Sequence, residues 1–252
     1  MFPYRDDNPT VLTPYITVAF IAANAVVWLL VQGLGTEPAL TRSVCTLGLI
    51  PGELLQLAGI GTRVPMGPGA ECVLGDTPTW YTPLTSMFLH GGWLHLIGNM
   101  WFLWVFGNNV EDSMGHIRFV LFYVLCGLAA AAAQIVVNPN SVIPMVGASG
   151  AISGVMGAYI VLYPKVRVHM LIFLGIFITT IAVPAWMMLG YWFLLQILSG
   201  LPMLAKETGG TAFWAHAGGF VAGMLLIWIF RDRSLVATRM AGQRREFRGH
   251  RW

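Results

Sequence analysis

The feature that most constrains this chain is a set of long apolar runs in which charged residues occur only at the ends. The runs cover residues 13–32, 89–106, 117–136, 149–163, 184–201 and 212–230. An α-helix needs about 20 apolar residues to cross the hydrocarbon core of a bilayer. Only 10% of the residues are charged, against about 25% in soluble domains. We therefore predict an all-α membrane protein with a bundle of six transmembrane helices.

The stretch 168–201 leaves the number of spans open, because it is one apolar run broken by Pro184. It holds either two spans or one span, 184–201, preceded by an interfacial or re-entrant piece. The distribution of Lys and Arg decides, because cytoplasmic flanks are enriched in these residues. With six spans, eleven basic residues lie on one side of the membrane and three on the other. We therefore expect six spans with both termini cytoplasmic, in a bacterial plasma membrane.

This topology divides the chain into segments. Residues 1–12 form a cytoplasmic N-terminus, residues 13–230 the membrane domain, and residues 231–252 a basic cytoplasmic tail with seven arginines. We expect this tail to contact anionic lipid headgroups rather than nucleic acid. Within the membrane domain, residues 33–81 form a long extracytoplasmic first loop, which is too long for a passive connection. Its cysteines, Cys45 and Cys72, are either a disulfide or two free thiols.

Few ionisable side chains lie deep in the predicted spans. They are His95 and His216, with His90 near the end of a span. Ionisable residues are costly inside a bilayer and are therefore candidates for function. A metal site built from these three histidines would lack a carboxylate or cysteine ligand. We therefore expect neither a metal nor another cofactor.

Ser149 begins the fourth predicted span, in the sequence Gly147-Ala148-Ser149-Gly150. Gly150 and Gly154 give this helix a bare face that another helix can approach closely. The run is also short, because fifteen residues rise only about 22 Å and the hydrocarbon core is about 30 Å thick. Ser149 therefore starts the helix below the membrane surface, where its unpaired backbone N–H groups need water or an oxyanion.

His216 lies in the last span, three residues before Gly219 and seven before Gly223. These residues share one helical face, which can pack against the small-residue face that begins at Ser149 and bring the imidazole towards the hydroxyl. Serine is a weak nucleophile until a positioned base takes its proton, and histidine exchanges protons near neutral pH. We predict that Ser149 is the nucleophile and His216 the general base.

His95 and Asn99 lie four residues apart on one helical face, so their side chains can donate hydrogen bonds to one point. Acyl transfer needs donors of this kind, aimed at the developing oxyanion. Taken alone, each feature is more often structural. A glycine-rich helix start usually serves packing, a lone histidine is usually hydrogen-bonded at a helix interface, and a polar pair usually joins two helices. Together they supply a nucleophile, a base and oxyanion donors, which favours a serine hydrolase site.

The motifs also resemble a known family. The sequences Gly147-Ala148-Ser149-Gly150, Ala215-His216 with Gly219 and Gly223, and His90…His95-xxx-Asn99 are similar to those of the rhomboid intramembrane serine proteases. The similarity covers residues 82–230 in order and spacing and includes the stretch 107–115.

This resemblance implies a six-helix core with a water-filled cavity and a Ser149–His216 dyad without an aspartate. It implies an oxyanion site formed by His95, Asn99 and the Ser149 N–H, and a fifth helix, here 184–201, that acts as a lateral gate. Substrates would be single transmembrane helices cut where they unwind. Some members carry a tyrosine four residues after the nucleophile, stacked on the histidine. This chain has Ser153 there, so the imidazole must be held in another way.

Two other classes of function remain to be weighed. A non-catalytic relative that binds transmembrane helices would be expected to lack Ser149 or His216, and both are present. A small-solute transporter would use broken helices and polar groups at mid-membrane, but the two halves of the chain show no obvious inverted repeat. We therefore expect a serine-type endopeptidase that acts on transmembrane protein substrates in the lipid bilayer.

Overall fold

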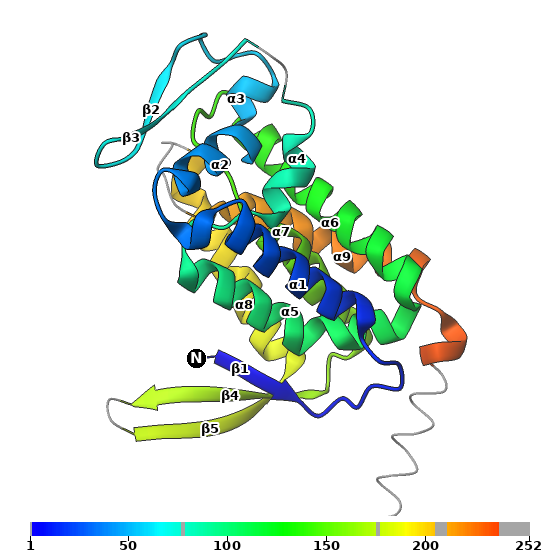
Figure 1. Ribbon diagram of the computed structural model, residues 1–252. Coiled ribbons are helices and arrows are strands. Elements are labelled where there is room, and N and C mark those ends of the chain that lie inside the picture. The colour runs from blue at the N-terminus through cyan, green and yellow to red at the C-terminus, as the bar shows by residue number, and fades with distance from the viewer. Residues whose placement is uncertain (1, 77–78, 175–176, 205–210, 237–252) are drawn as a thin grey trace, which may run out of the picture.

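The computed structural model describes residues 2–76, 79–174, 177–204 and 211–236, and it is mostly helical (Figure 1). Each of the predicted apolar runs forms a helix. These helices are α1 (Tyr15–Leu30), α5 (Trp93–Met114), α6 (His116–Val137), α7 (Ser149–Leu162), α8 (Ala185–Gly200) and α9 (Phe213–Phe230). By length and hydropathy, α6 and α9 are each able to cross a membrane, whereas α1, α7 and α8 are apolar but shorter.

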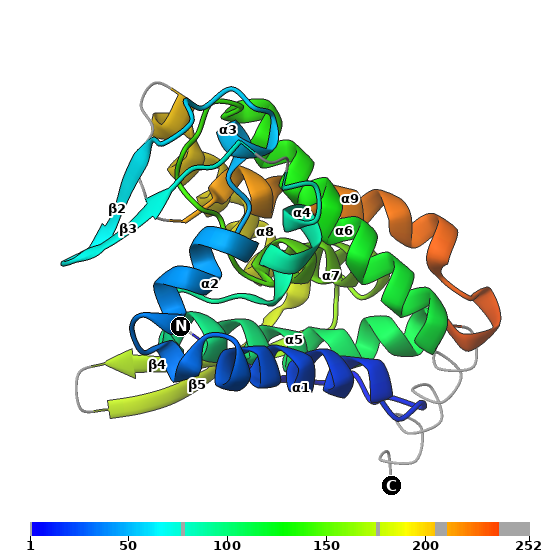
Figure 2. The ribbon, with the colours of Figure 1, turned by 45° about the horizontal axis from the view of Figure 1, so that its top comes forward.

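Helix α7 forms the centre of the bundle and packs against α5, α6, α8 and α9. Every residue from Ala151 to Tyr159 is buried, so this helix has no outward face. The surrounding helices instead turn large apolar side chains outward, as Leu121 of α6 and Ile229 of α9 show with exposed fractions of 54% and 77%. Apolar surface of this kind suits contact with lipid rather than water. Figure 2 shows α1 and α5 lying side by side on one flank of the bundle.

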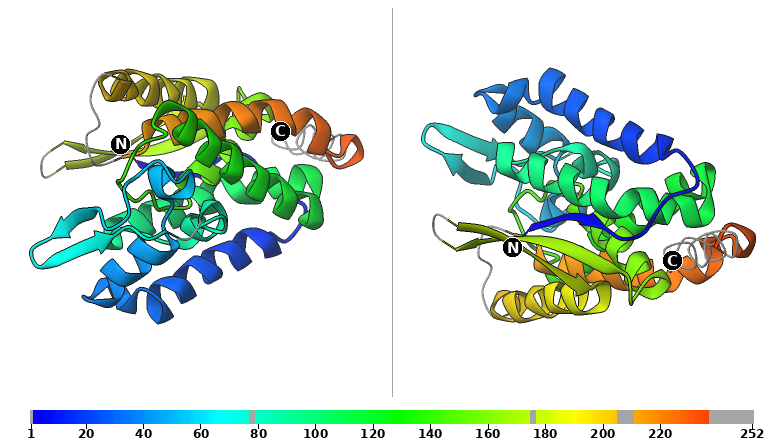
Figure 3. Two further views of the ribbon diagram at one scale, coloured as in Figure 1. Left: turned by 90° about the horizontal axis from the view of Figure 1, so that it is seen from above. Right: turned by 90° about the horizontal axis from the view of Figure 1, so that it is seen from below.

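Of the stretch 168–183, the described residues 168–174 and 177–183 form strands rather than a helical span or a re-entrant helix. Strands β4 (Arg167–Leu174) and β5 (Phe177–Pro184) form an antiparallel hairpin, and β1 (Phe2–Asp6) pairs with β4 to complete a sheet of order β1-β4-β5. The hairpin sequence is rich in β-branched residues, which favour strands. In the view from below, the strands lie beside the helices, with β1 against α5 and the hairpin towards α8 (Figure 3). The sheet therefore packs on the flank of the bundle.

The predicted first loop, residues 33–81, forms a lobe with secondary structure of its own in the part described, residues 33–76 and 79–81. It contains η1 (Gly33–Gly35), α2 (Ala39–Leu47), α3 (Pro51–Leu54), β2 (Arg63–Gly67) and β3 (Ala70–Val73), and α4 (Thr82–Thr85) and η2 (Ser86–Phe88) follow it. Cys45 and Cys72 form a disulfide, with their Cα atoms 5.3 Å apart. This resolves the two alternatives left open by the sequence. Ile50, Val64 and Leu74 surround the bridge in a small apolar cluster.

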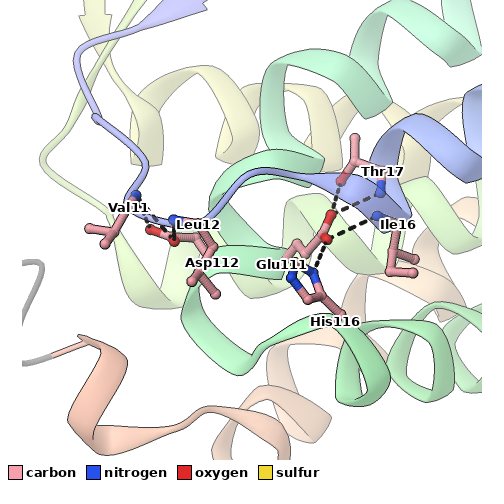
Figure 4. A network of polar contacts seen from close by, with 7 residues as sticks. All are labelled: Val11, Leu12, Ile16, Thr17, Glu111, Asp112 and His116. Carbon is pink, nitrogen blue, oxygen red and sulfur yellow. Dashed lines mark hydrogen bonds and ion pairs between the residues drawn. The ribbon is translucent and has the colours of Figure 1, made fainter.

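Helix α5 begins four residues later than predicted and extends eight residues further, to Met114. The extension contains Glu111 and Asp112, whose carboxylates bind the chain that enters α1 (Figure 4). Glu111 is fully buried and accepts hydrogen bonds from Ile16 N (2.9 Å), Thr17 N (2.8 Å) and Thr17 Oγ1 (2.7 Å). Backbone N–H groups at a helix start lack intrahelical partners. Those at the start of α1 bind the Glu111 carboxylate instead, which offsets the cost of burying it.

The remaining contacts at this end of the bundle join distant parts of the chain. Asp112 accepts hydrogen bonds from Val11 N and Leu12 N, and His116 Nδ1 lies 2.6 Å from Glu111 Oε1. Asp232, just after α9, donates its N–H to Ser113 O at 2.8 Å. The start of α1, the end of α5 and the end of α9 therefore meet at one end of the bundle.

Candidate active site

Ser149 is the first residue of α7. The chain reaches it through Gly147, which has a φ of +131°, a region that favours glycine. A Cβ at Gly147 would lie 2.8 Å from His95 Nε2, so glycine is also needed there for space. The first N–H groups of any α-helix have no intrahelical acceptor. The backbone N–H groups at Ser149 and Gly150 are therefore available to a ligand.

The glycine faces of α7 and α9 bring His216 to this helix start. A Cβ on Gly219 would lie 2.1 Å from Gly150 O, and one on Gly223 would lie 1.9 Å from Gly154 O. A real Cβ atom would clash at such distances. Only the Hα atoms of glycine fit between the two backbones here. The contact fixes both the spacing and the register of the two helices.

In this register the two side chains predicted for catalysis meet. His216 Nε2 lies 2.7 Å from Ser149 Oγ, although the two residues are 67 positions apart in the chain. The distance is that of a good hydrogen bond. The Ser153 hydroxyl does not serve the imidazole, because its Oγ donates to Ser149 O at 2.6 Å, within α7.

The other imidazole nitrogen of His216 has a partner that the sequence analysis did not identify. His216 Nδ1 lies 2.9 Å from Oε1 of Gln196, a residue of α8. Trp192, one turn earlier in α8, lies beside the imidazole with ring centroids 5.9 Å apart. The amide of Gln196 carries no charge, so the positions of ionisable residues in the spans do not indicate it. A glutamine in an otherwise apolar helix is the signal that could have revealed it.

His95 and Asn99 project from α5 towards the same site. Asn99 is buried, and its Nδ2 has no hydrogen-bond partner among the residues that the structure describes. His95 Nδ1 accepts a hydrogen bond from Gly91 N at 3.3 Å, while its Nε2 faces Gly147. A buried amide donor without a partner is costly, so Asn99 is suited to an acceptor that arrives with a ligand.

A cavity of about 640 Å³ joins these groups. Its lining includes Ser149, His216, His95 and Asn99, and its far wall includes polar residues of α6 and the following loop: Gln134, Asn138 and Ser141. The lining comes from the starts of α5, α7 and α9 and from the end of α6. The cavity therefore lies at the opposite end of the bundle from Glu111 and Asp112.

Comparisons with known proteins identify the family of this chain. The Rhomboid domain matches residues 77–233. The rhomboid protease GluP of Bacillus subtilis is 33% identical over 126 residues, which cover 48% of this chain and 24% of that protein. The rhomboid-like protein 11, chloroplastic, of Arabidopsis thaliana is 28% identical over 160 residues, 60% of this chain and 53% of that protein. The mitochondrial rhomboid protein 1 of Saccharomyces cerevisiae is 28% identical over 173 residues, 66% of this chain and 45% of that protein.

The chain belongs to the rhomboid family, which confirms the resemblance of its motifs. Rhomboid proteins are embedded in membranes, so this is a membrane protein. The match spans about half the length, or less, of these three relatives. Two of the three are named for chloroplasts and mitochondria, so membership of the family does not by itself assign a particular membrane.

Proposed function

We propose that the protein is an intramembrane serine endopeptidase that uses Ser149 as nucleophile and His216 as general base. The observation that carries the proposal is the 2.7 Å contact between Ser149 Oγ and His216 Nε2, in a cavity that His95 and Asn99 also line. A hydroxyl bound to an imidazole is activated for attack on a carbonyl carbon. The same cavity offers side-chain and backbone donors for the oxyanion.

The reaction follows from these positions. His216 Nε2 takes the hydroxyl proton while Ser149 Oγ bonds to the carbonyl carbon of the peptide, whose oxygen becomes an oxyanion. His95, Asn99 and the Ser149 N–H donate hydrogen bonds to this oxygen. The imidazolium then gives its proton to the leaving amine as the C–N bond breaks. A water molecule then attacks the acyl carbon while His216 takes its proton. The imidazolium returns this proton to Ser149 Oγ as the C–Oγ bond breaks, which releases the acid and restores the free hydroxyl.

The substrates would be transmembrane helices of other membrane proteins, cut in or near the bilayer. The cavity is enclosed by helices with apolar outer surfaces, so a substrate approaches from lipid. A helical peptide bond is protected by its own hydrogen bonds, which favours cleavage where the substrate unwinds. The reaction needs only water besides the groups of this chain.

We further propose six spans with both termini cytoplasmic, in a bacterial plasma membrane. Support comes from the contacts at the end of the bundle opposite the cavity. There Arg118 lies 3.6 Å from Asp232, and Asp7 N binds Arg167 O at 2.9 Å. Basic residues thus gather at one end, as expected for a cytoplasmic face. The cavity and the lobe of residues 33–81 would then be extracytoplasmic.

A fluorophosphonate probe tests the nucleophile, because it reacts with activated serines. We expect the wild type to be labelled, and Ser149→Ala and His216→Ala to be neither labelled nor able to cleave a co-reconstituted transmembrane reporter. Ser153→Ala is the matched control, because Ser153 is buried in the same helix; it should keep its label. A folded wild type without label or cleavage would instead favour a non-catalytic binder of transmembrane helices. Cleavage that survives Ser149→Ala would exclude the proposed mechanism.

A further inference from the structure

Helix α8 presents one polar side chain to the site, and this side chain binds the proposed base. Gln196 Oε1 lies 2.9 Å from His216 Nδ1, on the side of the ring opposite Ser149. Its neighbours Leu194 and Leu198 are 52% exposed, so the outward part of α8 is apolar. A primary amide among apolar groups is unfavourable unless it is hydrogen-bonded. The imidazole supplies that bond.

The packing of α8 on α9 holds the amide in place. Phe193 stacks on Phe220, with ring centroids 4.7 Å apart and an angle of 22° between the planes. One turn beyond Gln196, Gly200 accepts a hydrogen bond through its carbonyl oxygen from Trp214 Nε1 at 3.1 Å. These contacts lie on either side of Gln196 along α8, so its position relative to His216 is fixed from both sides.

We propose that Gln196 is a positioning residue that sets the tautomer and the ring orientation of His216. The inference rests on the proposed protease function. A carbonyl oxygen only accepts hydrogen bonds, so the contact places a proton on Nδ1. The neutral imidazole then has an unprotonated Nε2, the form that accepts the Ser149 proton. The opposite tautomer would place a second hydrogen between Nε2 and Oγ and block proton transfer.

Gln196 fills a role that a carboxylate fills in many serine hydrolases. In the part of the chain that the structure describes, no carboxylate lies within ion-pair distance of His216. A buried carboxylate carries a large desolvation cost, whereas an amide orients the ring without adding a charge. Its carbonyl dipole still faces the Nδ1–H when His216 becomes an imidazolium. This also explains how the imidazole is held while Ser153 occupies the position that carries a tyrosine in some rhomboids.

The tautomer can be measured directly and without activity. In the ¹⁵N spectrum of imidazole-labelled wild type near neutral pH, we expect His216 to show a protonated Nδ1 and an unprotonated Nε2. The signals are assigned by their loss in His216→Ala. Gln196→Met, which keeps the length but loses the acceptor, should shift the population towards the Nε2–H form. Gln196→Glu, which keeps an acceptor oxygen, should retain the Nδ1–H form.

Kinetics provide a second readout. We expect Gln196→Met to lower kcat on a transmembrane reporter by about 10- to 100-fold, as removal of the partner that orients a metal-bound histidine does, with KM nearly unchanged. Gln196→Glu should recover most of kcat. Leu194→Met is the matched control on the outward part of α8 and should match the wild type in both constants and in the spectrum.

The outcomes separate this inference from the proposed function. A wild type that cleaves nothing but shows the Nδ1–H form would contradict the protease proposal and leave Gln196 as the partner of His216. A wild type that cleaves and shows the Nε2–H form would overturn the inference. So would a Gln196→Met variant with unchanged kcat and an unchanged spectrum.

Discussion

The backbone of Gly219 touches the carbonyl group of Gly150, so closely that a Cβ on Gly219 would lie 2.1 Å from the oxygen. This contact stands one turn from His216 on α9 and one residue from Ser149 on α7. The distance between Ser149 and His216 is therefore determined by a helix contact that glycine backbones alone make. Any group added there must push the two helices apart.

Gly219→Ala should consequently reduce both stability and activity. Overpacking of a tight core costs about 1–3 kcal/mol, and the added methyl group would separate Ser149 Oγ from His216 Nε2. We expect a lower unfolding temperature in detergent and a slower reaction with a fluorophosphonate probe. Gly190→Ala is the matched control, because a Cβ there meets nothing within 4 Å. Equal stability and labelling rate in the two variants would contradict this account of the helix contact.

Asn99→Ala should lower kcat and leave KM nearly unchanged. The buried Nδ2 of Asn99 has no partner, and we expect it to bind the oxyanion only as the tetrahedral intermediate forms. Loss of one oxyanion donor typically costs about 10²- to 10³-fold in kcat. Steady-state kinetics on a transmembrane reporter measure this, with the unfolding temperature as a check on folding. A raised KM with an unchanged kcat would instead assign Asn99 to substrate binding.

Glu111→Ala should destabilise the protein strongly, because it leaves the Ile16 and Thr17 N–H groups without an acceptor (Figure 4). Hydrogen bonds to charged groups contribute about 1.5–3 kcal/mol each, so we expect a loss of about 3 kcal/mol or more. Thr17→Val removes only the hydroxyl bond at 2.7 Å to the same carboxylate and should cost about 1.5–3 kcal/mol, less than the loss of all the Glu111 contacts together. Denaturant unfolding in micelles compares the two. A similar loss in both variants would show that the backbone contacts of Glu111 contribute little.

Reduction of the Cys45–Cys72 disulfide should loosen the lobe of residues 33–81 and leave the helical bundle folded. The bridge closes a loop with a sequence separation of 27, for which chain entropy predicts a stabilisation of roughly 3–4 kcal/mol. We expect new protease cleavage sites within the lobe in Cys45→Ser/Cys72→Ser, while fluorophosphonate labelling of Ser149 persists. Cys126→Ser is the control for general effects of cysteine replacement. Loss of labelling on reduction alone would show instead that the lobe supports the cavity.

The helices were predictable from the sequence to within a few residues, except for α5, because long apolar runs have few alternatives in a membrane. The end of α5 was missed because Glu111 and Asp112 suggest a helix end until their backbone partners, almost a hundred residues earlier in the chain, are known. The hairpin β4–β5 was missed because hydropathy does not distinguish an apolar strand from an apolar helix. The glycine faces predicted the approach of His216 to Ser149. Gln196 was missed because its amide carries no charge, so it does not stand out among the ionisable residues of the spans.

The pairing of β1 with β4 has a consequence for the order of synthesis. Phe2 lies opposite Leu171 and Asp6 opposite Val168, so β1 is synthesised long before β4, and the two can pair only after the chain from α1 to α7 has been made. If helices insert as they emerge, the chain preceding α1 must remain on the side where β4 appears, and the sheet closes only afterwards. Formation of the β1–β4 pair is therefore a late event in biogenesis. The presence of the β1–β4 pair therefore indicates that the chain from α1 to α7 has already been synthesised.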